Sequence, residues 1–86
     1  MDTLILIPAY KPDEALIQTL IPLREYGFDI LVVNDGSPET YNAVFESAEK
    51  YATVIGYADN RGKGAAIKHG IRYPKNIKKE SGYENI

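Results

Sequence analysis

The chain has 86 residues, of which 44% are hydrophobic, and its 10 basic and 12 acidic side chains give a formal net charge of −2. These values argue against intrinsic disorder and give no indication of a nucleic-acid partner. The sequence contains no cysteine, which excludes disulfides and thiolate metal sites and fits a reducing cytoplasm. The early apolar run "LILIP" is too short for a signal peptide or a membrane span. We therefore expect a cytoplasmic chain that meets a membrane only through other regions.

Three apolar runs predict three strands. They cover residues 3–7, 29–34 and 52–57, and we expect Pro8 to end the first of them. Continuous apolar runs of this length, rich in β-branched residues, are typical of strands that are buried on both faces, as in a parallel sheet.

A helix is expected after each strand. Pro12 and Asp13 fit the start of the first helix, and Gly27 closes it. Its apolar stripe consists of Leu16, Ile17, Leu20 and Leu23. Ser37 is expected to cap the second helix, with Pro38 at its first position.

The third helix follows the glycines of residues 62–64. Its apolar and small positions fall at helical spacing and are Ala65, Ala66, Ile67, Gly70 and Ile71. Ala66 and Gly70 are one turn apart, so we expect them to let this helix approach the sheet closely. His69, the only histidine, has no acid near it in sequence and is expected on the surface.

The alternation of strands and helices predicts an α/β fold with a three-layer, Rossmann-like parallel sheet in the order β-α-β-α-β-α. We interpret residues 1–86 as a single partial domain, because three strands leave apolar faces and a sheet edge poorly covered. Residues 74–86 are polar and are expected to form a loop toward a fourth strand. The open edge or an exposed apolar face predicts a homo-oligomer.

Polar clusters follow all three predicted strands. They comprise residues 8–11, 34–37 and 59–64. In open parallel sheets, ligands bind at the carboxyl ends of the strands, so these clusters are expected at one edge of the sheet. Each cluster alone is weak evidence for a binding site. The prediction of a site rests on their expected position at the same edge of the sheet.

Asp35 is the acid at the centre of this edge. Its carboxylate can accept hydrogen bonds from a base N–H or from ribose hydroxyls, and Gly36 beside it fits a turn with positive φ. The alternative is that Asp35 caps the following helix. Ser37 is able to cap that helix instead, which favours ligand binding for Asp35.

Arg61 and Lys63 stand beside glycines at a helix N-terminus, where backbone N–H groups and cations suit a diphosphate. The alternative is two exposed basic residues in a loop. The "GKG" at residues 62–64 is neither a Walker loop nor the longer dinucleotide fingerprint. Tyr10 fits a position against a base or sugar, and equally a position packed at the strand end.

In order and spacing, "LILIPAYKPDEAL", "ILVVNDGSPE" and "NRGKGAAIKHGI" resemble the N-terminal half of family 2 glycosyltransferases of the GT-A fold. The resemblance covers roughly residues 3–73. It is nearest to members that move a hexose from a nucleotide sugar to a polyprenyl phosphate or another acceptor.

The resemblance implies that this chain carries the part of a glycosyltransferase that binds a UDP- or GDP-linked donor. Nucleotide-sugar-binding roles then fall to Pro8, Ala9, Tyr10, Asp13, Asp35, Arg61 and Lys63. Among the acids after the tyrosine, Asp13 is the first choice for the ribose and Glu14 the second. A divalent metal, Mg²⁺ or Mn²⁺, is expected for the full-length enzyme. The metal motif Asp-X-Asp and the catalytic base would follow residue 86, so this chain would hold no metal ligand or catalytic residue and would be inactive alone.

Two other hypotheses about the function stay open at this point. One is a standalone nucleotide-binding or assembly module without catalysis. The other is a nucleotidyltransferase fragment, which would need a lysine-bearing, glycine-rich loop directly after the first strand. The sequence there, "PAYKP", does not supply that loop.

Overall fold

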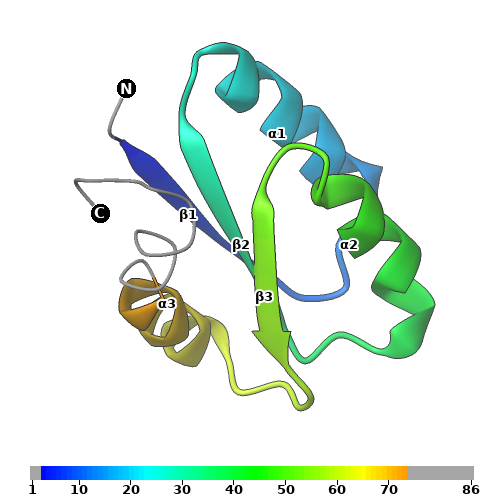
Figure 1. Ribbon diagram of the computed structural model, residues 1–86. Coiled ribbons are helices and arrows are strands. Elements are labelled where there is room, and N and C mark those ends of the chain that lie inside the picture. The colour runs from blue at the N-terminus through cyan, green and yellow to red at the C-terminus, as the bar shows by residue number, and fades with distance from the viewer. Residues whose placement is uncertain (1–2, 74–86) are drawn as a thin grey trace.

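A computed structural model describes residues 3–73 of the chain. The strands are β1 (Leu4–Ala9), β2 (Asp29–Asp35) and β3 (Thr53–Tyr57). The helices are α1 (Glu14–Glu25), the short 3₁₀ helix η1 (Glu39–Tyr41), α2 (Asn42–Ala48) and α3 (Lys63–Arg72). The strands form one parallel sheet in the order β1-β2-β3 (Figure 1). The loop expected at 74–86 lies outside the described residues.

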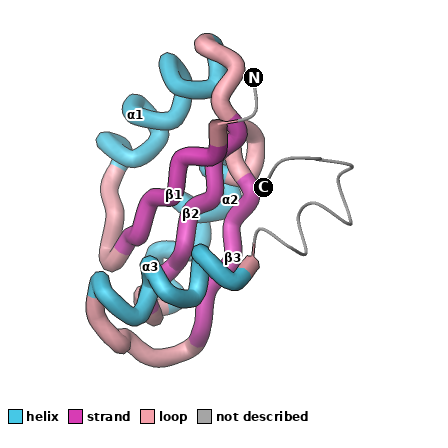
Figure 2. The backbone as a smooth tube through the Cα atoms, turned by 90° about the vertical axis from the view of Figure 1, so that its left-hand side faces the viewer, coloured by secondary structure: helices cyan, strands magenta, loops and turns pink. Residues whose placement is uncertain are grey.

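Helices cover both faces of the sheet, with α1 and α2 on one side and α3 on the other (Figures 1 and 2). The side chains of β2 alternate between the two layers, as strand geometry requires. Ile30 and Val32 belong to the core under α1 and α2, whereas Leu31 and Val33 pack with Ala66 of α3. The predicted three-layer α/β fold is therefore confirmed.

The helix α1 begins and ends as the sequence indicated. The Oδ1 atom of Asp13 accepts a hydrogen bond from the backbone N–H of Ala15 at 2.9 Å, so Asp13 caps the helix. The helix continues through Pro22 and ends at Glu25, before Gly27 with φ +89°. Because glycine adopts this left-handed conformation without steric cost, it allows the chain to turn into β2.

Two local expectations are wrong. Pro8 does not end the first strand but lies within β1, opposite Val33 of β2. A proline is tolerated there because β1 is an outer strand of the described sheet. Ser37 does not cap a helix: its Oγ accepts the backbone N–H of Lys11 at 2.9 Å, and the turn after it begins as η1.

The helix α3 lies close against the sheet, as Ala66 and Gly70 predicted. Both residues are buried, and a Cβ atom built on Gly70 would lie 2.3 Å from Cδ1 of Leu6. Ile71 differs from expectation, because it is 63% exposed on the outer side of the helix. None of the helices within residues 3–73 has the length and apolar character that crossing a membrane requires.

Candidate functional site

A pocket lies at the carboxyl ends of the parallel strands. Its volume is about 380 Å³, and its lining combines residues at the end of each strand or directly after it: Pro8, Ala9, Tyr10, Asp35, Asn60, Gly62 and Lys63. Pockets that bind small molecules usually have volumes of roughly 300–1,000 Å³. The fold thus brings together five of the residues predicted from the sequence, and adds Asn60 and Gly62.

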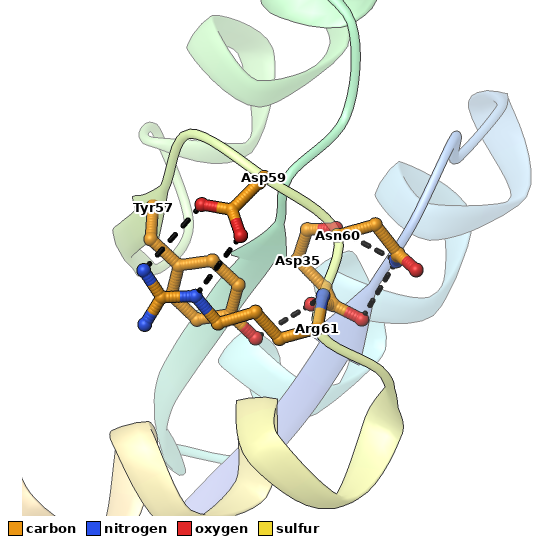
Figure 3. Close-up of polar contacts among 5 residues, drawn as sticks. All are labelled: Asp35, Tyr57, Asp59, Asn60 and Arg61. Carbon is orange, nitrogen blue, oxygen red and sulfur yellow. Dashed lines mark hydrogen bonds and ion pairs between the residues drawn. The ribbon is translucent and has the colours of Figure 1, made fainter.

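Asp35, the last residue of β2, is the centre of a hydrogen-bond network (Figure 3). Its side chain is only 3% exposed. Oδ1 accepts the hydroxyl of Tyr57 at 2.6 Å and the backbone N–H of Arg61 at 2.9 Å. Oδ2 accepts the side-chain amide of Asn60 at 3.0 Å, and that amide also binds the backbone carbonyl of Asp35. The buried charge is therefore balanced by donors from the end of β3 and from the β3–α3 loop.

The same network sets two pKa values. Burial alone would raise the pKa of the Asp35 carboxyl, but the Tyr57 hydroxyl and the Arg61 N–H stabilise its ionised form. Together they hold the pKa of Asp35 below its ordinary value of 3.8. Burial and the neighbouring Asp35 carboxylate raise the pKa of Tyr57 to about 12. At neutral pH the pair is a carboxylate that accepts from a neutral phenol.

Gly36 lets the β3–α3 loop lie directly on the end of β2. Its φ is +68°, and a Cβ atom built on it would lie 2.1 Å from the backbone N of Asn60. No residue with a side chain fits this position without moving the loop. The sequence-based expectation of a positive φ at Gly36 is confirmed, and the close passage of Asn60 is a second reason why this position requires glycine.

Tyr10, directly after β1, and Lys63, after the loop that follows β3, both line the pocket. Tyr10 is 47% exposed, and the ammonium of Lys11 lies 5.3 Å from the centroid of its ring. Tyr10 therefore lines the pocket with an exposed side chain and is not packed in the core. Lys63 is exposed at the first position of α3, directly after Gly62.

Two predicted residues lie elsewhere. Asp13 caps α1 and does not line the pocket. Arg61 contributes its backbone N–H to Asp35, but its guanidinium lies 4.6 Å from the centroid of the Tyr57 ring and pairs with Asp59 at 3.4 Å. Its side chain lines a separate hollow of about 200 Å³ beside α3, together with Lys68 and His69.

Sequence reasoning missed the roles of Tyr57 and Asn60. Tyr57 lies opposite Asp35 in the register of β2 and β3, and Asn60 follows it in the loop. The available signal was the position of both residues at the end of the third strand, next to an acid at the end of the second. His69 was also misplaced: it is half-buried, with its ring edge-to-face on Tyr57 at 5.2 Å.

A smaller hollow of about 170 Å³ lies at the opposite, amino-terminal ends of the strands. It includes Arg24 and Asp29, whose nearest side-chain atoms are 3.7 Å apart. We place the site at the carboxyl ends, because ligands of open parallel sheets bind there and because the buried carboxylate lies there.

The described residues do not fit a resident divalent metal. Within residues 3–73, no group of three or more His, Cys, Asp or Glu side chains is arranged to hold an ion. The acid that lines the pocket, Asp35, already accepts from a hydroxyl and two N–H donors. We therefore derive no step through Mg²⁺ or Mn²⁺ for these residues.

Comparisons with known proteins agree with this architecture. The model of glycosyl transferase family 2 matches residues 4–76. An uncharacterized protein of Methanocaldococcus jannaschii is 28% identical over 78 residues, which cover 86% of this chain and 34% of that relative. The chain thus spans about a third of the length of this curated relative. No solved structure matches the chain significantly.

Proposed function

Because this chain belongs to glycosyl transferase family 2, we propose that its pocket binds the nucleotide of a sugar-nucleotide donor. The observation that carries the proposal is the buried carboxylate of Asp35 in the pocket wall, at the end of the central strand. A buried carboxylate that lines a cavity is a strong acceptor for the N–H groups of a base or for ribose hydroxyls. Tyr10, on the opposite wall, offers a ring face to the base or sugar.

The diphosphate of the donor would lie at the start of α3. The residue before that helix, Gly62, has no side chain to cap it, so first-turn N–H groups are available to an anion. Lys63 adds an ammonium at the same place and lines the pocket. Arg61 would act through its backbone, because its guanidinium is held over Tyr57 by Asp59.

The finer assignments belong to the same proposal. The donor would be UDP- or GDP-linked, and the acceptor a polyprenyl phosphate or a polysaccharide. For the ribose, Asp13 would act from outside the pocket lining, through the oxygen that does not cap α1, and Glu14 is the alternative. The catalytic base and the divalent metal would be supplied by other regions of a longer, cytoplasmic enzyme, and this chain would be its donor-binding half.

Isothermal titration with UDP and GDP tests the proposal. We expect binding to weaken by about tenfold in Lys63→Ala, the loss of one charge-assisted contact. Lys68→Ala is the matched control, since it removes a lysine of the same helix that lines the other hollow. UMP and GMP should bind more weakly than the diphosphates. Equal affinity in the two lysine variants would contradict the phosphate assignment.

A further inference from the structure

The two oxygens of the Asp35 carboxylate have different neighbours. Oδ1 accepts two short hydrogen bonds, from the Tyr57 hydroxyl and the Arg61 N–H, whereas Oδ2 accepts one, from the Asn60 amide. The backbone N–H of Gly62 also faces the carboxylate and helps to lower the pKa of Asp35. An ionised carboxylate has about four lone-pair sites, two on each oxygen. Oδ1 is therefore filled by hydrogen bonds within the protein, and Oδ2 is the oxygen with fewer of them.

The residues that donate to the carboxylate line two different hollows near the β3–α3 loop. Asn60 and Asp35 line the pocket at the strand ends. Tyr57 and Arg61 line the hollow beside α3 instead. The Tyr57 hydroxyl thus approaches Oδ1 from a residue outside the pocket lining, whereas Oδ2 lies beside Asn60, which lines the pocket.

Tyr57 is itself held in place from three directions. Its backbone pairs with Asp35 in the sheet. The Arg61 guanidinium lies over one face of its ring at 4.6 Å from the centroid, and the ring of His69 meets it edge-to-face at 5.2 Å. Cation–π and edge-to-face contacts of this kind fix ring orientation. The hydroxyl is consequently aimed at Oδ1 before any ligand arrives.

We infer that Tyr57 is a positioning residue of the nucleotide site, whose hydroxyl fixes the rotation of the Asp35 carboxylate so that Oδ2 alone receives a ligand N–H or O–H. The inference deepens the proposed function and rests on it. It names the ligand group by chemistry: a hydrogen-bond donor is accepted at this position, and a ligand acceptor there would face an anion. Tyr57 does not line the pocket and acts through Asp35.

The test compares Tyr57→Phe with Tyr51→Phe. Both changes remove one hydroxyl and keep the ring, and Tyr51 is a half-buried tyrosine packed against the α2 side of the sheet. The first readout is the carboxyl ¹³C shift of Asp35 as a function of pH, without a ligand. We expect the pKa of Asp35 to rise in Tyr57→Phe and to stay unchanged in Tyr51→Phe. An unchanged titration in Tyr57→Phe would overturn the inference.

The second readout is the affinity for UDP and GDP at neutral pH. We expect Tyr57→Phe to bind about tenfold more weakly, with no change in Tyr51→Phe. Unchanged affinity together with a raised pKa of Asp35 would also overturn the inference, because the orientation of the carboxylate would then not matter to the ligand. No binding by the unaltered chain would instead overturn the proposed function, while the titration still decides whether Tyr57 controls Asp35.

Discussion

The central strand carries an aspartate at each end, and the two ends of the sheet are built differently. Asp29, at the start of β2, has a side chain 17% exposed and faces the guanidinium of Arg24 at 3.7 Å. Asp35, at the end of β2, is 3% exposed and accepts three donors at 2.6–3.0 Å. The first is a partly solvated ion pair, which contributes little to stability. The second is a buried charge held by short, directed hydrogen bonds, and it is the end that lines the larger pocket.

Glycines at the two ends show the same contrast. Gly27 precedes β2 with φ +89°, and a Cβ atom there would meet nothing within 4 Å. Gly36 follows β2 with φ +68°, and a Cβ atom there would collide with the backbone of Asp59 and Asn60. A similar backbone conformation thus serves only a turn at one end and close loop packing at the other. Tight packing around the acid, rather than the acid itself, therefore distinguishes the site.

The largest expected effect comes from alanine at these two glycines. Gly27→Ala should lower the free energy of unfolding by about 1 kcal/mol, from the left-handed conformation alone. Gly36→Ala should cost at least about 3 kcal/mol, because the loop must also move. Urea unfolding measures both. Equal losses in the two variants would show that the loop does not press on Gly36 in solution.

The next largest effect is expected from replacing Asp35 or Asp29 with asparagine. In Asp35→Asn, whichever oxygen becomes NH₂ would face a donor: the Tyr57 hydroxyl and Arg61 N–H on one side, or the Asn60 amide on the other. We expect nucleotide affinity to fall by about tenfold or more and the melting temperature to fall clearly. Asp29→Asn should cost less than about 1 kcal/mol and leave affinity unchanged. Comparable melting temperatures for the two variants would remove the distinction between the ends.

A smaller effect is expected on the stability of the chain at alkaline pH. The pKa of Tyr57 is raised from 10.0 to about 12 in the folded state, through burial and the Asp35 carboxylate. Its contribution to stability is therefore complete below pH 10 and is lost as the pH rises toward 12. The loss of stability between pH 9 and pH 11.5 should be smaller in Tyr57→Phe than in the unaltered chain. Parallel profiles for the two proteins would argue against a hydrogen bond between Tyr57 and Asp35.

The smallest expected effect concerns self-association of the chain. We propose that copies associate through an outer strand of the sheet or through the side chain of Ile71 on α3, which is 63% exposed. Sedimentation velocity at increasing concentration should show a growing dimer fraction, which Ile71→Lys reduces if the helix surface is used. A sedimentation coefficient that is constant and monomeric at all concentrations would rule out both surfaces.

Much of the fold could be predicted because β2 begins with "DILVV", a β-branched apolar run that is typical of a strand covered on both faces. The close approach at Gly70 and the positive φ at Gly36 followed from single residues. Pro8 was misassigned because its place in β1 depends on the strand order, which a proline does not encode. The position of the Arg61 side chain depends on Asp59 and Tyr57, whose contacts are set by the folded loop. The sequence could therefore place Arg61 at the correct edge, but not its guanidinium on the correct side of the loop.

The most direct test of the central claim is a titration of the ¹⁵N-labelled chain with UDP or GDP, followed by NMR. We expect saturable shifts at the carboxyl ends of the strands, in the backbone amides of Tyr10, Gly36, Gly62 and Lys63, and none around Arg24 and Asp29. Shifts confined to the amino-terminal ends, or no saturable shift with either nucleotide, would contradict it.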